Sequence, residues 1–366
     1  MSNIDLNIAY SLDDLCIVPA ASSDVESRKS CNPYYKIFAY NLDDKSEVHE
    51  TLPIFTAPMP SVINDNIDVI HNYFNNHITP VIPRSSDFKT RRRLCTEQKL
   101  FVAFSLNETQ YFIDNKELLL GTTLPYKICI DVANGNMKNL LYRIQKLKEI
   151  YGENMIIMSG NVANYESYKC LSNYGCDYVR VSIGTGSACT TATNTGIYMP
   201  MATLISQCKD TGYSARIVAD GGINSYRNIN KALALGASFV MLGGMLNKLS
   251  DSAGNVVSDG NGKKYKVHFG MASTEGQKAL GKEHMLTPPE GKVIYQEMEN
   301  KTIKEFSEEY THYLRSAMSY CGRMDIVNFA RSDIRLRVMS PSASKQYNQS
   351  REDLMPSGIG TAQIIL

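Results

Sequence analysis

A single cysteine stands in a run of small residues that could hold a reactive thiolate. Cys189 lies within Ser182-Ile-Gly-Thr-Gly-Ser-Ala-Cys-Thr-Thr191, directly after an apolar run. Small residues let a ligand and the backbone approach closely, and successive backbone N–H groups can stabilise an anion or a thiolate. Most of the other cysteines fall within apolar stretches, where a thiol is typically inert core. Cys189 is therefore a candidate nucleophile, with a small buried residue in a tight loop as the alternative interpretation.

Two pairs of glycines follow two consecutive apolar runs. Gly221 and Gly222 come after one run, and Gly243 and Gly244 come after the next. Such loops bind phosphate through backbone N–H groups, so the two pairs together predict a phosphate site, although paired glycines can also simply end strands. Asp220 would then face the hydroxyls of a sugar, because a carboxylate can accept two hydrogen bonds from a cis-diol.

Eight short apolar runs carry these loops, and helical patterns such as 139–151 and 226–235 separate them. Near-continuous apolar strands with helical crossovers indicate a parallel sheet buried on both faces. Eight is also the number that closes a (β/α)8 TIM barrel, whose chemistry sits after the carboxyl ends of its strands. An open doubly wound sheet is the alternative. The predicted strands are 52–58, 78–83, 100–106, 126–133, 154–161, 176–183, 215–222 and 237–244.

The composition excludes several classes of protein. The 366 residues are 43% hydrophobic, which suffices for a large core, and 38 basic against 37 acidic residues leave a formal charge of +1. No global field therefore steers the chain toward nucleic acid or an anionic membrane. The nine cysteines form no CxxC pair, and neither a signal peptide nor a membrane span is recognisable. A cytoplasmic protein is expected.

A series of motifs resembles, in order and spacing, the IMP dehydrogenase/GMP reductase family over roughly residues 8 to 338. Between the second and third predicted strands there is no room for the regulatory module that most IMP dehydrogenases insert, and no Arg-Tyr pair stands between Met271 and Glu290. The resemblance is therefore closer to the GMP reductase branch. The matching segments are 130–135, 159–162, the Cys189 loop, 219–222, 240–245, 262–266, 269–271 and 289–292.

The resemblance implies a reductive deamination. Cys189 would attack carbon 2 of a guanine nucleotide, ammonia would leave, and a hydride from NADPH would convert the covalent thioimidate to IMP. Thr191 and Glu290 match the positions that handle the ammonia proton. The alternatives are an IMP dehydrogenase without the regulatory module, a reductase of another 2-amino purine nucleotide, and a silent nucleotide-binding regulator, which would need none of these three side chains.

The resemblance also implies binding residues, a potassium ion and a homotetramer. There is no GxGxxG fingerprint, so no Rossmann dinucleotide site is expected. The implied substrate residues are Ser187, Asp220, Gly221, Gly222, Gly243, Gly244, Gly270 and Met271. The implied dinucleotide residues are Ser27, Arg28, Asp131, Ala133, Asn134 and Gly135. The implied potassium ligands are the carbonyl groups of Gly184, Gly186 and Cys189.

Several features lie outside the family pattern or its motifs. Ala192 and Thr287 stand where the family usually has arginine. The basic run 89–93 either reaches the 2′-phosphate of NADPH or forms the solvated face of a helix. We expect one barrel domain over 1–338, with a flap at about 271–300. The remaining tail, 339–366, is expected to be disordered or to dock on a neighbouring subunit.

Overall fold

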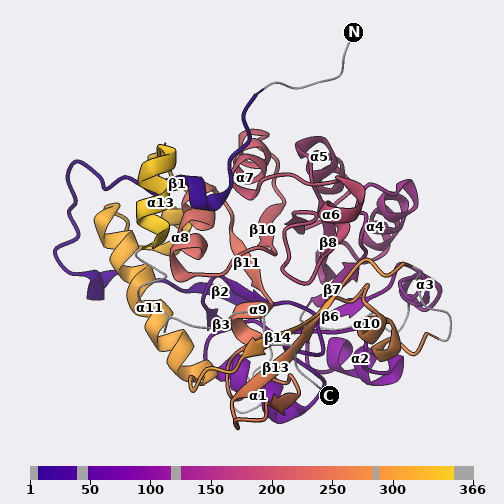
Figure 1. Ribbon diagram of the computed structural model, residues 1–366. Helices are drawn as coiled ribbons and strands as arrows, with labels where there is room; N and C mark the ends of the chain where they lie inside the picture. Colours follow the sequence, from indigo (N-terminus) through magenta and orange to yellow (C-terminus); the bar gives the residue numbers. More distant parts are fainter. Residues whose placement is uncertain (1–6, 39–47, 117–124, 283–287, 350–366) are drawn as a thin grey trace.

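The computed structural model describes residues 7–38, 48–116, 125–282 and 288–349 (Figure 1). Thr287, part of the flap and the end of the tail lie outside these residues. Each of the eight predicted strands is present, most of them shorter than expected. The barrel strands are β4 (Ile54–Thr56), β5 (Val81–Ile82), β6 (Phe101–Phe104), β7 (Tyr126–Asp131), β8 (Met155–Val162), β9 (Tyr178–Val181), β10 (Arg216–Asp220) and β11 (Phe239–Leu242).

These strands form one parallel sheet in the order β4-β11-β10-β9-β8-β7-β6-β5. The two end strands meet through a parallel bridge between Phe55 and Thr79. Thr79 N donates to Ile54 O and Thr56 N donates to Thr79 O, each at 3.0 Å. The sheet is therefore closed into a (β/α)8 barrel, and the open doubly wound alternative is wrong.

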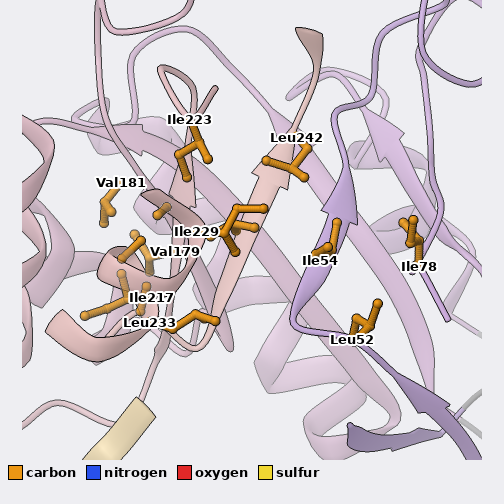
Figure 2. Packing of buried hydrophobic residues seen from close by; sticks show 14 of the residues in the cluster. Leu52, Ile54, Ile78, Val179, Val181, Ile217, Ile223, Ile229, Leu233 and Leu242 are labelled. Atoms are coloured by element: carbon orange, nitrogen blue, oxygen red, sulfur yellow. The ribbon is translucent and has the colours of Figure 1, made fainter. Parts of the chain in front are cut away.

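Alternate residues of each strand point into the barrel or toward the helices, as the two-residue period of a strand requires. The interior is filled by a small cluster that includes Phe55, Phe101, Tyr178 and Phe239. The larger cluster packs between strands and helices, and Figure 2 shows part of it, with strand residues such as Ile54 and Leu242 facing it. The same alternation determines which polar side chains of the strands point into the barrel.

Helices surround the barrel and follow its strands in turn. The predicted helices 139–151 and 226–235 are confirmed as α4 and α8. Side-chain caps fix several helix starts: Asp87 accepts from Thr90 N before α2, and Thr302 and Glu305 form a capping box at α11. The surrounding helices are α1 (Ile67–Asn75), α2 (Phe88–Thr96), α3 (Gln110–Asp114), α4 (Lys138–Tyr151), α5 (Tyr165–Asn173), α7 (Met201–Asp210), α8 (Tyr226–Leu235) and α11 (Ile303–Tyr320).

Segments from both ends of the chain pack on the barrel. Strand β1 (Leu15–Ile17) pairs with β15 (Leu336–Val338). The hairpin of β2 (Tyr35–Phe38) and β3 (Val48–Thr51) reaches the barrel interior, where the Tyr35 ring stacks on Phe239 at 4.9 Å between centroids. Helix α12 spans Ile326–Arg331.

The first part of the tail is a helix, α13 (Pro341–Gln349), where disorder or docking on a neighbouring subunit was expected. Its Tyr347 packs against α8 of the same chain, with the Arg227 guanidinium 4.5 Å from the ring centroid. The ring therefore has a cationic partner within its own chain. Residues 350–366 lie outside the described part of the chain.

An antiparallel sheet is inserted between β11 and α11. It comprises β12 (Val256–Ser258), β13 (Lys264–Phe269) and β14 (Val293–Glu297), and the flap leaves from β13 and returns through β14. Short helices α6 (Thr191–Thr195), α9 (Gly244–Asn247) and α10 (Thr274–Ala279) occupy loops at the carboxyl ends of strands. Among the described residues, no helix combines the length and apolar character needed to cross a membrane.

Candidate active site

The loop after β9 holds Cys189 at the carboxyl end of the barrel. The thiol is partly buried and donates a hydrogen bond to the Thr191 hydroxyl, with 3.2 Å between Sγ and Oγ1. Cys189 N donates to Gly186 O at 3.0 Å, which closes the loop into a tight turn. Two of the three catalytic side chains that the resemblance implies, Cys189 and Thr191, are therefore in direct contact.

The other cysteines are unsuited to nucleophilic attack at this end of the barrel. Six of them are buried: Cys31, Cys95, Cys129, Cys176, Cys208 and Cys321. Burial raises the pKa of Cys95, Cys129 and Cys208 to about 12, so these thiols remain protonated at neutral pH. Cys16 lies on β1 and Cys170 on α5, away from the loop after β9.

The flap pairs with the Cys189 loop through its backbone. Cys189 and Gly291 form an antiparallel bridge. On either side, Thr190 N donates to Glu290 O at 3.2 Å and Lys292 N donates to Ala188 O at 3.0 Å. Glu290, whose side chain is exposed, is thereby fixed by the main chain beside the Cys189 loop.

The glycine loops meet at the same end of the barrel. Gly221 and Gly222 have φ angles of 84° and 71°, a conformation that glycine adopts without strain. A Cβ on Gly221 would lie 2.9 Å from Thr185 Oγ1, and one on Gly270 would lie 3.0 Å from Ala188 O. Only glycine therefore allows these close approaches to the Cys189 loop. Of the other predicted substrate residues, Ser187 belongs to the Cys189 loop, Met271 follows Gly270 after β13, and Gly243 and Gly244 follow β11 at the carboxyl end of the barrel.

A chain of ion pairs crosses the carboxyl end of the barrel. Arg180 on β9 donates to Asp131 Oδ1 on β7 at 2.7 Å and, through Nε, to Asp220 Oδ2 on β10 at 2.9 Å. Arg84 donates to Asp131 Oδ2 at 2.9 Å, and Asn161 Nδ2 donates to Asp220 Oδ2 at 2.7 Å. The predicted ligand residues Asp131 and Asp220 are therefore joined by one arginine.

The ion pairs decide the charge state of Asp131. Burial alone would raise the pKa of its carboxyl group, but the guanidinium groups of Arg180 and Arg84 outweigh burial and hold the pKa below its usual range. Asp131 is therefore an anion at neutral pH. The sequence reasoning missed Arg84, Asn161 and Arg180, although a charged residue within the apolar run 176–183 was a usable signal.

A cavity of about 440 Å³ opens beside Asp131, with Arg84 on its wall. Ala133 and Asn134, both predicted dinucleotide residues, line it. Gly135 N donates to Asn161 O at 2.9 Å and lies close under the backbone of β8. The cavity and the Cys189 loop thus lie at the same end of the barrel.

Ser27 and Arg28 lie elsewhere on this chain. Arg28 begins a short 3-10 helix, Arg28–Ser30, which packs against α11. Helix α11 contacts α1 and α8, beside β4 and β11, which lie across the barrel from β7 in the strand order. Within one chain, therefore, the structure does not bring these two residues to Asp131.

The basic run 89–93 is divided between internal contacts and solvent. Arg91 is 3% exposed, pairs with Glu108 at 2.5 Å and donates to Ala103 O at 2.9 Å. Arg92 donates to the Tyr111 hydroxyl. Arg91 therefore contradicts the interpretation of the whole run as a solvated face, because its charge is held inside the protein by a carboxylate.

Fold and site together define a (β/α)8 barrel with a thiol-bearing loop and a paired flap at its carboxyl end. The chain belongs to the IMP dehydrogenase / GMP reductase domain family, whose model matches residues 84–350. The chain is 29% identical to a GMP reductase of Buchnera aphidicola subsp. Acyrthosiphon pisum (strain APS) over 310 residues, 82% of this chain and 84% of the relative.

Two further relatives represent both branches of the family. The mouse GMP reductase 1 is 29% identical over 347 residues, 92% of this chain and 97% of that protein. The inosine-5′-monophosphate dehydrogenase of Bacillus subtilis (strain 168) is 36% identical over 206 residues, 54% of this chain and 42% of that protein. The similarity to GMP reductases therefore extends over more of both chains.

Proposed function

We propose that this protein is an NADPH-dependent GMP reductase, which converts GMP to IMP and ammonia. The observation that carries the proposal is the backbone pairing of Cys189 with Gly291, which holds the flap segment that bears Glu290 beside the loop in which the Cys189 thiol contacts the Thr191 hydroxyl. The extent of similarity to proteins named GMP reductase favours reduction over dehydrogenation of IMP. Purine nucleotide salvage is the corresponding metabolic role.

In this proposal the Cys189 thiolate adds to carbon 2 of the guanine ring. The exocyclic amine takes up a proton and leaves as ammonia, so carbon 2 becomes part of a thioimidate. A hydride from NADPH then adds to carbon 2, and the thiolate leaves to give IMP. One GMP, one NADPH and two protons thus yield IMP, NADP⁺ and ammonium. Thr191 and Glu290 move the proton to the amine.

The nucleotide would be held by the loops around Cys189. Gly221, Gly222, Gly243 and Gly244 bind the 5′-phosphate through backbone N–H groups, and Asp220 accepts hydrogen bonds from the ribose. Ser187, Gly270 and Met271 would contact the guanine base. The close approach of Gly221 and Gly270 to the Cys189 loop supports the assignments at these two glycines.

The dinucleotide would occupy the cavity beside Asp131. Asp131, Ala133 and Asn134 line one side of it, Gly135 follows them directly in the chain, and Arg84 adds a cation suited to a phosphate. Ser27 and Arg28 belong to this site only if they come from a neighbouring subunit, which a homotetramer would provide.

A potassium ion fits the loop between Gly184 and Cys189. The loop offers neutral oxygen atoms and no carboxylate, and Gly184 has a φ of 79°, with 2.8 Å between a Cβ placed there and Ala192 Cβ. Backbone carbonyl oxygens are typical ligands of potassium. The carbonyl groups of Gly184, Gly186 and Cys189 would hold the ion, whose charge would fix the conformation of the loop.

One absorbance experiment at 340 nm tests the proposed function. GMP with NADPH should give a steady fall in absorbance and a stoichiometric release of ammonia, because each turnover oxidises one NADPH. IMP with NAD⁺ should give no sustained rise. A sustained rise would identify an IMP dehydrogenase without the regulatory module, and no change in either mixture would identify a nucleotide-binding regulator. XMP and NADH in place of GMP and NADPH serve as specificity controls.

Replacing Thr191 by valine or Glu290 by glutamine should slow the departure of the amine far more than hydride transfer. Loss of a proton-transfer group costs about a hundredfold or more, so conversion of GMP should fall by at least that factor. Hydride transfer from IMP to NADP⁺, measured as the first burst at 340 nm, should change less than about tenfold. Thr191→Ser keeps the hydroxyl and is the matched control. Equal slowing of both steps would show that Thr191 and Glu290 do not act specifically in the departure of the amine.

A further inference from the structure

Arg180 links the two carboxylates that the proposed function gives to different ligands. Its Nη1 donates to Asp131, and its Nε and Nη2 both approach Asp220 Oδ2 at 2.9 Å. Strands β7, β9 and β10 position these three side chains. Asp131, Arg180 and Asp220 follow the interior residues Cys129, Tyr178 and Val218 by two, so all three point into the barrel.

The cluster is buried and its formal charges balance. Arg180 is 9% exposed at its side chain, and Asp131 and Asp220 are each 13% exposed. With Arg84, two cations face two anions. Electrostatic interactions are stronger here than at the surface, because little water screens them. A change in the charge or position of one carboxylate therefore alters the electrostatic environment of the other, because both bind the same guanidinium group.

The shape of arginine matters as well as its charge. A guanidinium group presents several N–H donors in one rigid plane, so it can bind two carboxylates at once, whereas a lysine ammonium is a compact point charge on a flexible chain. Gly160 lets β8 pack closely against this residue on β9, since a Cβ there would lie 2.4 Å from Arg180 O and 2.9 Å from Arg180 Cβ.

Both carboxylates also remain available to a ligand. Asp131 lines the cavity. Asp220 uses only Oδ2 in its bonds to Arg180 and Asn161, and Oδ1 has no partner among the residues that the structure describes. An ion-pair cluster that served stability alone would not need a free carboxylate oxygen on one side and a cavity on the other.

We propose that Arg180 is a positioning residue that couples the two ligand subsites, so that binding at Asp220 and binding at Asp131 strengthen each other. The inference rests on the proposed function for the identity of the two ligands. The first ligand to bind fixes the arrangement of Asp131, Arg180 and Asp220. The second ligand then meets carboxylates that are already ordered, so less conformational entropy is lost when it binds.

Calorimetry on the Cys189→Ala protein measures this coupling without turnover. The ligands are GMP and 2′-phospho-ADP-ribose, which retains both riboses of NADPH but has no nicotinamide ring to stack on the purine. In the presence of saturating GMP, the affinity for 2′-phospho-ADP-ribose should rise by at least about fivefold, the lower end of typical coupling. Adding Arg180→Lys, which keeps the charge, should reduce the factor to less than about twofold.

Arg84→Gln is the matched control, because Arg84 contacts Asp131 and not Asp220. Arg84→Gln should weaken the binding of 2′-phospho-ADP-ribose and leave the affinity for GMP unchanged. The coupling between the two ligands should be retained. Coupling that survives Arg180→Lys, or that is absent from the parent protein although both ligands bind, would overturn the proposal.

Melting temperatures of ligand-free variants test the coupling through Arg180 independently of the proposed function. Asp131→Asn, Asp220→Asn and the double variant should depart from additivity by at least about 2 °C, because both carboxylates share one partner. This departure should shrink in the Arg180→Lys protein. Additive effects would overturn the coupling whichever ligands bind. If neither GMP nor 2′-phospho-ADP-ribose binds, the proposed function fails, and the melting temperatures alone decide on Arg180.

Discussion

Replacing Cys189 by alanine is expected to reduce the turnover of GMP with NADPH by at least about a thousandfold, equivalent to about 4 kcal/mol of activation free energy. The thiolate forms the covalent bond in the proposed reaction, and no other described cysteine lies in the loop after β9. The affinity for GMP should change less than about threefold, because alanine removes one atom and no phosphate or ribose contact.

The matched control is Cys170→Ala, which removes an exposed thiol from α5. Its turnover should equal that of the parent protein. Mass spectrometry after mixing IMP and NADP⁺ should detect a covalent adduct in the parent protein and in Cys170→Ala, and none in Cys189→Ala. If Cys189→Ala retains a substantial share of the parent rate, the covalent mechanism is wrong.

The second large effect concerns the phosphate. Guanosine should bind the Cys189→Ala protein at least about a hundredfold more weakly than GMP. Backbone N–H groups left without an acceptor cost about 1–3 kcal/mol each, and two lost bonds suffice at about 1.4 kcal/mol per decade. Because the proposed donors are backbone groups of Gly221, Gly222, Gly243 and Gly244, no side-chain rearrangement could replace the phosphate. Calorimetric titration measures both affinities.

The ribose gives an internal control for the same titration. Asp220→Ala should weaken GMP more than dGMP, since the deoxynucleotide already lacks the 2′-hydroxyl. The phosphate preference should survive this substitution, because Asp220 does not belong to the glycine donors. Similar affinities for guanosine and GMP would show that the glycine loops do not bind the 5′-phosphate, and the proposed orientation of the substrate would then be wrong.

The barrel could be predicted because apolar runs and turn residues are local features of the sequence. All eight strands and the helices α4 and α8 lie where the periodicity places them. The lengths were overestimated, as at β4, because residues such as Leu52 and Ala57 are buried core without belonging to the strand. Burial and strand pairing are separate properties, and hydrophobicity reports only the first.

The part of the site that depends on side-chain pairing could not be predicted. The run 176–183 showed that Arg180 is a charge in an apolar strand, but its partners lie on two other strands, 49 and 40 residues away. Arg91 was expected either to reach a phosphate or to face solvent. Its partner Glu108 lies in a different segment of the sequence, so the ion pair could not be predicted from the run 89–93. The contact of Tyr347 with α8 likewise depends on residues distant in the sequence.

The pairing of the flap with the Cys189 loop bears on the timing of catalysis. Moving the flap away would break the bonds at Ala188 and Thr190 together, and Glu290 would leave the Cys189 loop in the same motion. In the proposed reaction, opening of the flap would therefore also separate Glu290 from Cys189 and Thr191. In the proposed reaction, an open protein would admit nucleotide without completing turnover, and the backbone pairing would couple closure of the flap to catalysis.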